Sequence, residues 1–185
     1  MLEFMKYDDW QKSVPTEIPG DALWKVEVYR LSLFIADLAW HDVKKLAHNR
    51  LMFGLADQLY RAVGSMAANI SEGYSRSSGK DRARFYEYAL GSAHESRGWF
   101  YKGRHVLGDA VADHRMKIVT QVVRLLLTMV PDQRSVYLQE EIVPYKCSPE
   151  NVTSDELLAL LTDVPLPDFT HHGSRINLLP VPHAT

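Results

Sequence analysis

Residues 58–99 place the strongest constraint on the fold, because two helical patterns meet there at a short polar corner. Apolar side chains recur every three or four residues on both sides of the corner, which indicates two amphipathic helices. Small residues on each helix leave little side-chain volume on its surface, so the two helices can approach closely. Gly73 is a helix stop signal, and serines fill the turn before the second helix restarts near Lys80. The stretch predicts an antiparallel helical hairpin.

The whole chain fits a single all-α domain. Its 185 residues are enough for one sizeable core, and 46% hydrophobic with 24% charged residues is ordinary for a globular protein. We expect an up-down-up-down four-helix bundle over residues 21–131, with Pro131 ending its last helix. An N-terminal arm over 1–20 and an acidic, proline-rich C-terminal extension over 132–185 flank it, the latter with a short helix near 154–162. No run reaches the apolar length of a membrane span.

The first bundle helix is apolar nearly all round in its middle, over residues 31–40. A helix with apolar residues on most faces is buried on most faces. In a bundle of four helices this predicts a second interface, most simply with another subunit. The candidate oligomer-interface residues are Leu31, Phe34, Ile35 and Leu38.

The net charge of −2 is unevenly distributed along the chain. Residues 1–20 carry a net charge of −2, residues 21–130 carry +5 and residues 131–185 carry −5. The body is thus mildly basic and both ends are acidic. An ordinary solvated surface is one explanation of this pattern. The more specific alternative is a polyanion-binding patch on the body that the acidic ends shield.

Basic and aromatic residues alternate just after the corner. Four cations lie within nine residues that contain one acid, Asp81, and Tyr74, Phe85, Tyr86 and Tyr88 are interleaved with them. This mixture suits phosphate contact and base stacking, although a solvated helix face explains each cation taken singly. The candidate nucleic-acid-binding residues are Arg61, Arg76, Lys80, Arg82 and Arg84.

The sequence contains none of the common motifs for catalysis or metal binding that were expected of a helical bundle or a phosphate-binding or hydrolase fold. No Glu is followed three residues later by His, as di-iron bundles require, and the chain has no Gly-x-x-x-x-Gly-Lys loop or Gly-x-Ser-x-Gly elbow. Asp37 and His41 are four residues apart, and a helix-surface pair is favoured over a metal site. Cys147, the only cysteine, is interpreted as a free thiol without a chemical role. The lack of a second cysteine for a disulfide fits a reducing cytosol. We expect no metal, cofactor or small-molecule substrate.

The corner also carries a longer motif, Gln-Leu-x-Arg-Ala, then Ser, then Asn-Ile-x-Glu-Gly-x-x-Arg, then Ala-x-Gly-Ser-x-x-Glu. Its residues here are Gln58, Leu59, Arg61, Ala62, Ser65, Asn69, Ile70, Glu72, Gly73, Arg76, Ala89, Gly91, Ser92 and Glu95. With this motif, residues 21–130 resemble the four-helix bundle proteins encoded within intervening sequences of large-subunit ribosomal RNA genes. Accessory proteins of diversity-generating retroelements are similar, more distantly. The resemblance implies a homo-oligomer, a pentameric ring in that family.

The polar residues of this motif are Asn69, Glu72, Ser92 and Glu95. We favour a structural network in which Asn69 and Glu72 satisfy backbone groups or pair with an arginine, with a partner-binding surface as the alternative. The predicted function is a non-enzymatic, homo-oligomeric, cytoplasmic bacterial scaffold that contacts RNA, DNA or a ribonucleoprotein. The resemblance adds a reverse transcriptase as a candidate partner. The alternative function is a protein-binding or structural module without nucleic-acid binding.

Overall fold

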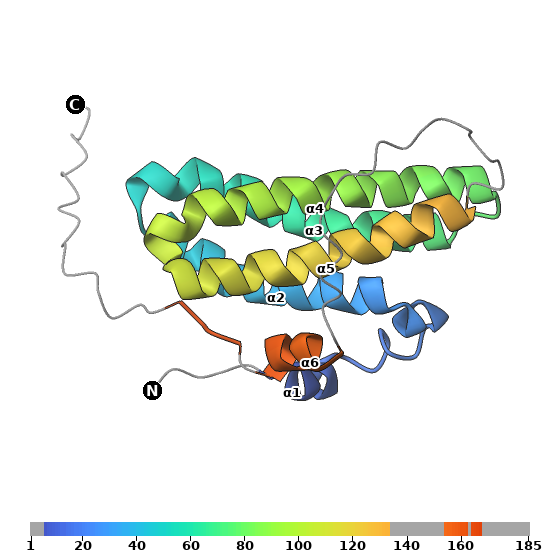
Figure 1. Cartoon of the computed structure of the whole chain (residues 1–185), viewed down its shortest axis with the longest axis horizontal. Coiled ribbons are helices and arrows are strands. Elements are labelled where there is room, and N and C mark those ends of the chain that lie inside the picture. The colour runs from blue at the N-terminus through green and yellow to red at the C-terminus, as the bar shows by residue number, and fades with distance from the viewer. Residues whose placement is uncertain (1–5, 134–153, 163, 168–185) are drawn as a thin grey trace, which may run out of the picture.

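Four long helices form the body of the protein, here called the bundle. The computed structural model describes residues 6–133, 154–162 and 164–167. The bundle helices are α2 (Glu27–Ala47), α3 (Phe53–Tyr74), α4 (Gly79–Leu107) and α5 (Asp109–Gln133). Each contacts the next along the chain, α2 also contacts α5, and Figure 1 shows them side by side with short turns between them. The described residues contain no strand, so the all-α prediction is confirmed.

Two short 3₁₀ turns with polar caps lead into α2 and α3. Asp21 Oδ1 accepts a hydrogen bond from the backbone N–H of Leu23 (2.8 Å) and caps the turn η1 (Ala22–Lys25). Asn49 caps the turn η2 (Arg50–Met52) in the same way. These side chains satisfy backbone donors at the start of the two turns, whereas α2 and α3, which follow directly, begin without a side-chain cap of their own.

The two ends of α5 differ in how well the sequence predicted them. Gly108 separates α5 from α4 with a φ of +90°, a conformation that favours glycine. Pro131 was expected to end the helix, but α5 continues to Gln133. Proline removes one backbone hydrogen bond, and this loss does not prevent the final turn from keeping helical geometry.

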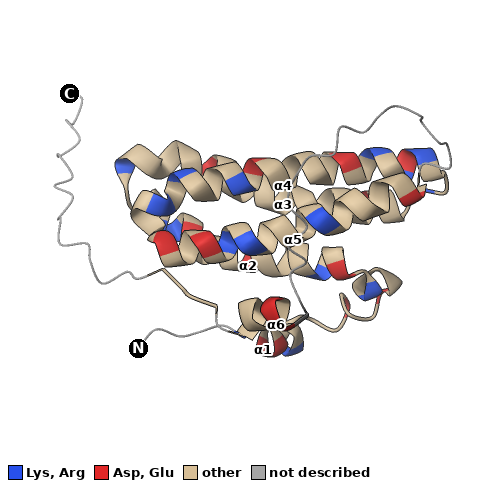
Figure 2. Ribbon diagram, viewed as in Figure 1, with Lys and Arg blue, Asp and Glu red and all other residues tan. Residues whose placement is uncertain are grey.

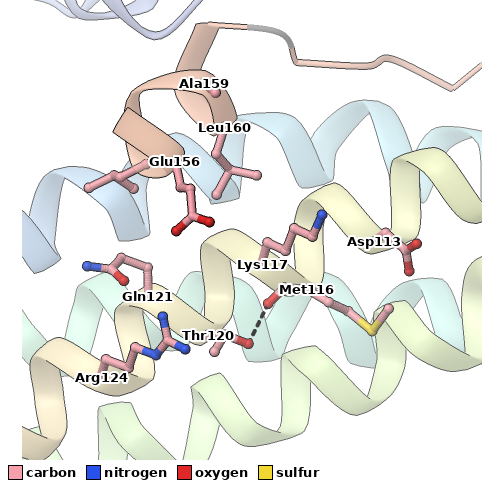
Figure 3. A pocket seen from close by; sticks show the side chains of 10 residues that line it. Asp113, Met116, Lys117, Thr120, Gln121, Arg124, Glu156, Ala159 and Leu160 are labelled. Carbon is pink, nitrogen blue, oxygen red and sulfur yellow. Dashed lines mark hydrogen bonds between the residues drawn. The ribbon is translucent and has the colours of Figure 1, made fainter. Parts of the chain in front are cut away.

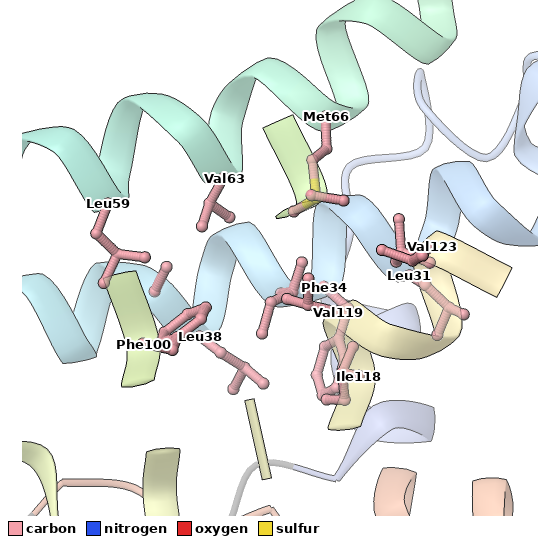
Figure 4. Close-up of a cluster of buried hydrophobic side chains, with 14 of the residues drawn as sticks. Leu31, Phe34, Leu38, Leu59, Val63, Met66, Phe100, Ile118, Val119 and Val123 are labelled. Carbon is pink, nitrogen blue, oxygen red and sulfur yellow. The ribbon is translucent and has the colours of Figure 1, made fainter. Parts of the chain in front are cut away.

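Apolar stripes from all four bundle helices meet in a dry core (Figure 4). Each buried leucine or phenylalanine contributes about 1.5–3 kcal/mol relative to an exposed position. The side chains at its centre have an exposed fraction of 0%: Phe34, Leu38, Leu59, Met66, Phe100, Ile118 and Val119.

The four candidate oligomer-interface residues lie inside a single chain. Leu31, Phe34, Ile35 and Leu38 are 1%, 0%, 0% and 0% exposed. Their assignment to an interface between subunits is therefore corrected, because a side chain without exposed surface has none to bury against a second copy. The all-round apolar pattern is real, and segments of the same chain cover it.

The N-terminal arm covers part of this face with a helix, α1 (Tyr7–Ser13). Trp10 of α1 is 4% exposed, and its indole N–H donates a hydrogen bond to Asp37 Oδ2 of α2 (2.6 Å). Its ring lies 5.1 Å from the ring of Phe34, centroid to centroid, and Tyr7 packs edge-on against the same phenylalanine. Asp37 thus holds α1 on the bundle.

The C-terminal extension covers the adjoining part with α6 (Ser154–Thr162) and residues 164–167. Helix α6 contacts both α1 and α5, and Figure 1 shows α1 and α6 together beneath α2. The Val164 side chain is fully buried. We call α1, α6 and residues 164–167 the terminal cap.

A buried ion pair joins α2, α5 and the terminal cap. Arg115 and Asp42 are both 0% exposed, and Arg115 Nε and Nη2 donate to the two carboxylate oxygens of Asp42 at 2.8 and 3.2 Å. Arg115 Nη2 also donates to the carbonyl of Pro165 (2.8 Å), and Nη1 lies 2.9 Å from His114 Nδ1. The guanidinium therefore connects three segments of the chain.

The partners of His114 fix its protonation. Its Nε2 lies 2.7 Å from the carbonyl oxygen of Leu160, which can only accept, so Nε2 carries the proton. Nδ1 then accepts from Arg115. Burial and the charge of Arg115, with a smaller contribution from Lys117, lower the pKa of His114 from 6.5 to about 4. The hydrogen bond from Arg115 to His114 Nδ1 thus depends on a neutral imidazole, whereas the Nε2 proton that Leu160 accepts is present in either protonation state.

Acid should destabilise the fold at this site, because a protonated Nδ1 cannot accept a hydrogen bond from Arg115. Because the folded pKa of His114 lies below its unfolded value, its stabilising contribution is complete above pH 6.5 and is lost as the pH falls towards 4. Between pH 7 and 4 the unfolding free energy of the wild type should fall by roughly 2–3 kcal/mol more than that of His114→Leu. Urea unfolding across this range measures the difference. Parallel curves for the two proteins would contradict the assignment.

Candidate nucleic-acid interface

The basic and aromatic residues singled out in the sequence gather at the turn between α3 and α4. Helix α3 ends at Tyr74 and α4 begins at Gly79, so only four residues form the turn. Ser78 caps α4 by accepting a hydrogen bond from the backbone N–H of Asp81 (3.4 Å). The short turn keeps the end of α3 beside the start of α4.

Gly73 sets how closely the two helices approach at this turn. It is buried inside α3, and a Cβ atom there would lie 2.7 Å from Cε1 of the Tyr86 ring and 3.1 Å from Cβ of Phe85. Gly73 had been interpreted as a helix stop signal, but α3 continues through it to Tyr74. Its role is steric, because any side chain would push α4 away.

Two arginines lie over one aromatic ring beside the turn. The guanidinium carbons of Arg76 and Arg84 lie 4.7 and 5.5 Å from the centroid of the Phe85 ring. Tyr88 contacts the same ring edge-on, at 5.8 Å. Arg76 also pairs with Glu72 one helical turn earlier. The arrangement presents two planar cations on an aromatic support.

Lys80 and Arg82 differ in how available they are. Lys80 is exposed in the first turn of α4. Arg82 is partly buried, its Nη2 donates to the carbonyl of Ser77 (3.4 Å), and its buried Nε has no hydrogen-bond partner among the described residues. Arg82, a candidate nucleic-acid-binding residue, therefore packs onto the turn and is less available to a ligand than Lys80. We call Arg76, Lys80, Arg84 and Phe85 the corner cluster.

Arg61 does not join the corner cluster. It lies on α3 fifteen residues before Arg76, about 22 Å along the helix axis at 1.5 Å per residue. It is exposed, lies 3.7 Å from Asp57 and donates to Gln58 Oε1 (3.3 Å). Figure 2 shows that lysines and arginines occur along the bundle with acidic residues between them. The basic surface is local to the turn.

The polar residues of the motif bond mostly within their own helices. Asn69 donates to the carbonyl of Ser65 (2.8 Å), and Glu95 accepts from the indole N–H of Trp99 (3.1 Å). Ser92 donates to the carbonyl of Tyr88 (3.0 Å). With the Glu72–Arg76 pair, these bonds match the structural interpretation favoured from the sequence. They link residues four apart along the chain and do not tie α3 to α4.

The family comparison supplies the deciding observation. Residues 25–129, more than half of the chain, match the family model described as 23S rRNA-intervening sequence protein. The chain belongs to this family. The resemblance drawn from the corner motif is thereby confirmed, while the more distant similarity to retroelement accessory proteins stays a prediction.

A solved structure supports the fold of this family member. It is a crystal structure of a protein of unknown function from the S23 ribosomal protein family of Bacteroides thetaiotaomicron, 23% identical, with a TM-score of 0.53. The match covers 56% of the present chain and 97% of the other, so that chain consists almost wholly of the matched region. At this identity the likeness shows the fold alone. No curated protein matches the chain.

Asp37 and Cys147 are the residues considered for metal and thiol chemistry. The Asp37 carboxylate is engaged by the indole of Trp10, and no group of three or more metal-ligating side chains occurs in the described part of this family member. Cys147 lies outside the described residues. Across the same described part, no helix has the length and hydropathy needed to cross a bilayer.

The glycines Gly64, Gly91 and Gly98 were expected between α3 and α4, but they lie on an outward surface of these helices that also carries exposed tyrosines. Tyr60, Tyr88 and Tyr101 are 48%, 53% and 54% exposed. A Cβ added at the mid-helix glycines Gly64, Gly91 or Gly98 would have no neighbour within 4 Å. In the sequence, these tyrosines and glycines recur at helical spacing on a second face of each helix, away from the buried side chains. Each glycine costs its helix about 1 kcal/mol relative to alanine, and the single chain offers no packing reason for it.

Two alanine substitutions on α3 should have opposite effects. Gly73→Ala places a Cβ against Tyr86 and should lower the unfolding free energy by about 1–3 kcal/mol, as overpacking does. Gly64→Ala meets open space and should raise it by up to about 1 kcal/mol through helix propensity. Urea midpoints measure both. Equal shifts for the two variants would show that Gly73 has no steric role.

Proposed function

We propose that this family member is a non-enzymatic helical scaffold that contacts nucleic acid through the corner cluster. The observation that carries the proposal is the pair of guanidinium groups over Phe85, with Lys80 beside them on the first turn of α4. Arginine binds phosphate oxygens through paired donors, and its plane also stacks on bases. The cluster therefore offers both backbone contact and a stacking surface.

The pairing of Arg76 with Glu72 does not prevent phosphate contact. Both side chains are close to half exposed, and exposed ion pairs contribute about 0–1 kcal/mol. A phosphate group can displace the carboxylate at little energetic cost. The cluster is small, however, and the chain has a net charge of −2, so a single copy should bind weakly. Several copies in one assembly would engage one nucleic acid together and gain by multivalency.

Nucleic-acid binding should depend on salt through the corner cluster. Replacing Arg76, Lys80 and Arg84 by Ala should flatten the slope of log affinity against log salt, by roughly 0.7–0.9 per lost phosphate contact. Arg82 is left in place because it packs on the turn. Fluorescence anisotropy with single-stranded RNA, structured RNA and duplex DNA between about 50 and 200 mM salt measures the slope.

The matched control removes three exposed cations elsewhere, with Lys25, Arg61 and Lys117 changed to Ala. It changes the net charge by the same amount and should keep most of the wild-type slope. Circular dichroism should show both triple variants folded. If the wild type binds none of the three probes near 50 mM salt, or if both variants lose the slope equally, the proposal fails.

We also propose that copies assemble through the outward tyrosine and glycine surface of α3 and α4. Assembly needs a surface other than the one first expected, because that surface is buried inside one chain at Leu31, Phe34, Ile35 and Leu38. Mid-helix glycines permit close approach of a neighbouring helix, and exposed tyrosines supply contact area at low entropic cost. A homo-oligomer, a pentamer by resemblance, is the form this proposal takes.

Gly91→Arg should disrupt this assembly without unfolding the chain, because a Cβ at Gly91 has open space. Light scattering should find the wild type larger than its 21.1 kDa monomer at micromolar concentration, and the variant near the monomer mass. Thr128→Arg, on the exposed side of α5, is the control and should assemble like the wild type. A monomeric wild type would contradict the proposal.

A protein-binding module is the second candidate. Leu51 and Phe53, at the turn between α2 and α3, are 89% and 68% exposed. Large apolar side chains at such exposure are typical of contact surfaces for other proteins. This function becomes the first choice if the nucleic-acid titrations show no binding.

A further inference from the structure

The C-terminal part of the terminal cap is an addition to the family bundle. Residues 154–162 and 164–167 lie outside the matched range of 25–129. Twenty residues, 134–153, separate them along the chain from the end of α5. Their position against α1 and α5 thus depends on the contacts they make and not on a short connection.

Two buried side chains of α5 hydrogen-bond to the main chain of this segment. His114 donates to the carbonyl of Leu160 (2.7 Å) and Arg115 donates to the carbonyl of Pro165 (2.8 Å). Val164, which lies between these two residues in the sequence, is 0% exposed. Pro167 is buried as well, and main-chain hydrogen bonds combined with buried side chains are a general way in which proteins bind peptide segments.

The bundle orients the binding groups without help from the segment. Asp42 of α2 accepts two hydrogen bonds from Arg115 and fixes the plane of its guanidinium. Arg115 in turn donates to His114 Nδ1, which leaves the Nε2 proton of His114 directed outward to the segment. A site whose donors are held in place beforehand loses less entropy when a ligand binds.

Helix α6 packs less closely than the bundle helices, although Leu160 and Leu161 lie partly buried against the core. An open groove of about 680 Å³ lies between α6 and α5, with Lys117, Gln121 and Arg124 on its α5 side. Figure 3 shows Glu156 and Leu160 extending from α6 towards α5 across this groove. Leu158 of α6 is 62% exposed. Helix α6 therefore lacks the close packing that joins the bundle helices to one another.

We propose that Asp42, His114 and Arg115 form a docking site for a peptide that combines a helix end with a proline-containing stretch, and that Leu160 of α6 and residues 164–167 of the same chain occupy it as a separable ligand. The site recognises two carbonyl groups five residues apart and the valine between them. Because these contacts do not depend on the connection to α5, the same segment supplied as a free peptide docks in the same way.

The test begins with the full chain, carrying a protease recognition sequence inserted after Cys147 and cleaved after folding. The C-terminal fragment should stay with the bundle during gel filtration at micromolar concentration. A labelled synthetic peptide of residues 152–168 should then exchange with it, measured by fluorescence anisotropy. Circular dichroism before and after exchange reports whether the bundle stays folded.

Matched variants locate the contact on both sides. In the peptide, Val164→Asp should weaken binding at least tenfold, whereas Leu158→Asp should bind like the wild type, because Val164 is buried and Leu158 exposed. In the bundle, His114→Leu should weaken binding about tenfold, and Lys102→Leu, at an exposed position of α4 outside the groove, should leave it unchanged.

Three outcomes would overturn the proposal. Release of the fragment at once on cleavage, with the bundle still helical, would show that no docking site exists. Equal binding of the Val164→Asp and wild-type peptides would show that the site does not recognise this segment. Loss of bundle structure when the fragment leaves would show that the segment is an integral part of the core and not a ligand.

Discussion

The Asp42–Arg115 ion pair is the interaction on which the arrangement of the other segments depends. Both side chains are completely buried, and removing one partner from such a pair costs about 3–5 kcal/mol because the other charge is left unpaired. The pair holds α2 against α5 within the bundle. Its remaining donors reach His114 and Pro165, so the same guanidinium also positions the terminal cap.

The terminal cap changes what can be inferred about assembly. It covers the middle of α2, where an all-round apolar pattern had indicated a second subunit. The solved relative matches over 97% of its own length and only 56% of this chain, so it has little room for equivalents of the two extensions. A face that this chain covers with its own termini is closed to other copies, which directs attention to the outward surface of α3 and α4.

The corner between α3 and α4 shows how steric fit limits a candidate binding surface. Gly73 allows the Tyr86 ring to approach α3, and this approach sets where the first turn of α4 lies. Arg76 and Arg84 then share the Phe85 ring, while Arg82 is drawn back onto the turn. The cluster thus has three available cations, and Arg61, far along α3, does not add a fourth.

The sequence by itself determined the all-α class, the family and the position of the corner, because helical periodicity, capping residues and a local motif are all encoded by residues near one another. It did not determine which apolar face meets which partner. Trp10 and Asp37 are 27 residues apart, and Arg115 and Asp42 are 73 apart. Only the tertiary structure brings such residues together, since burial and ion pairing depend on distances in space that no local pattern records.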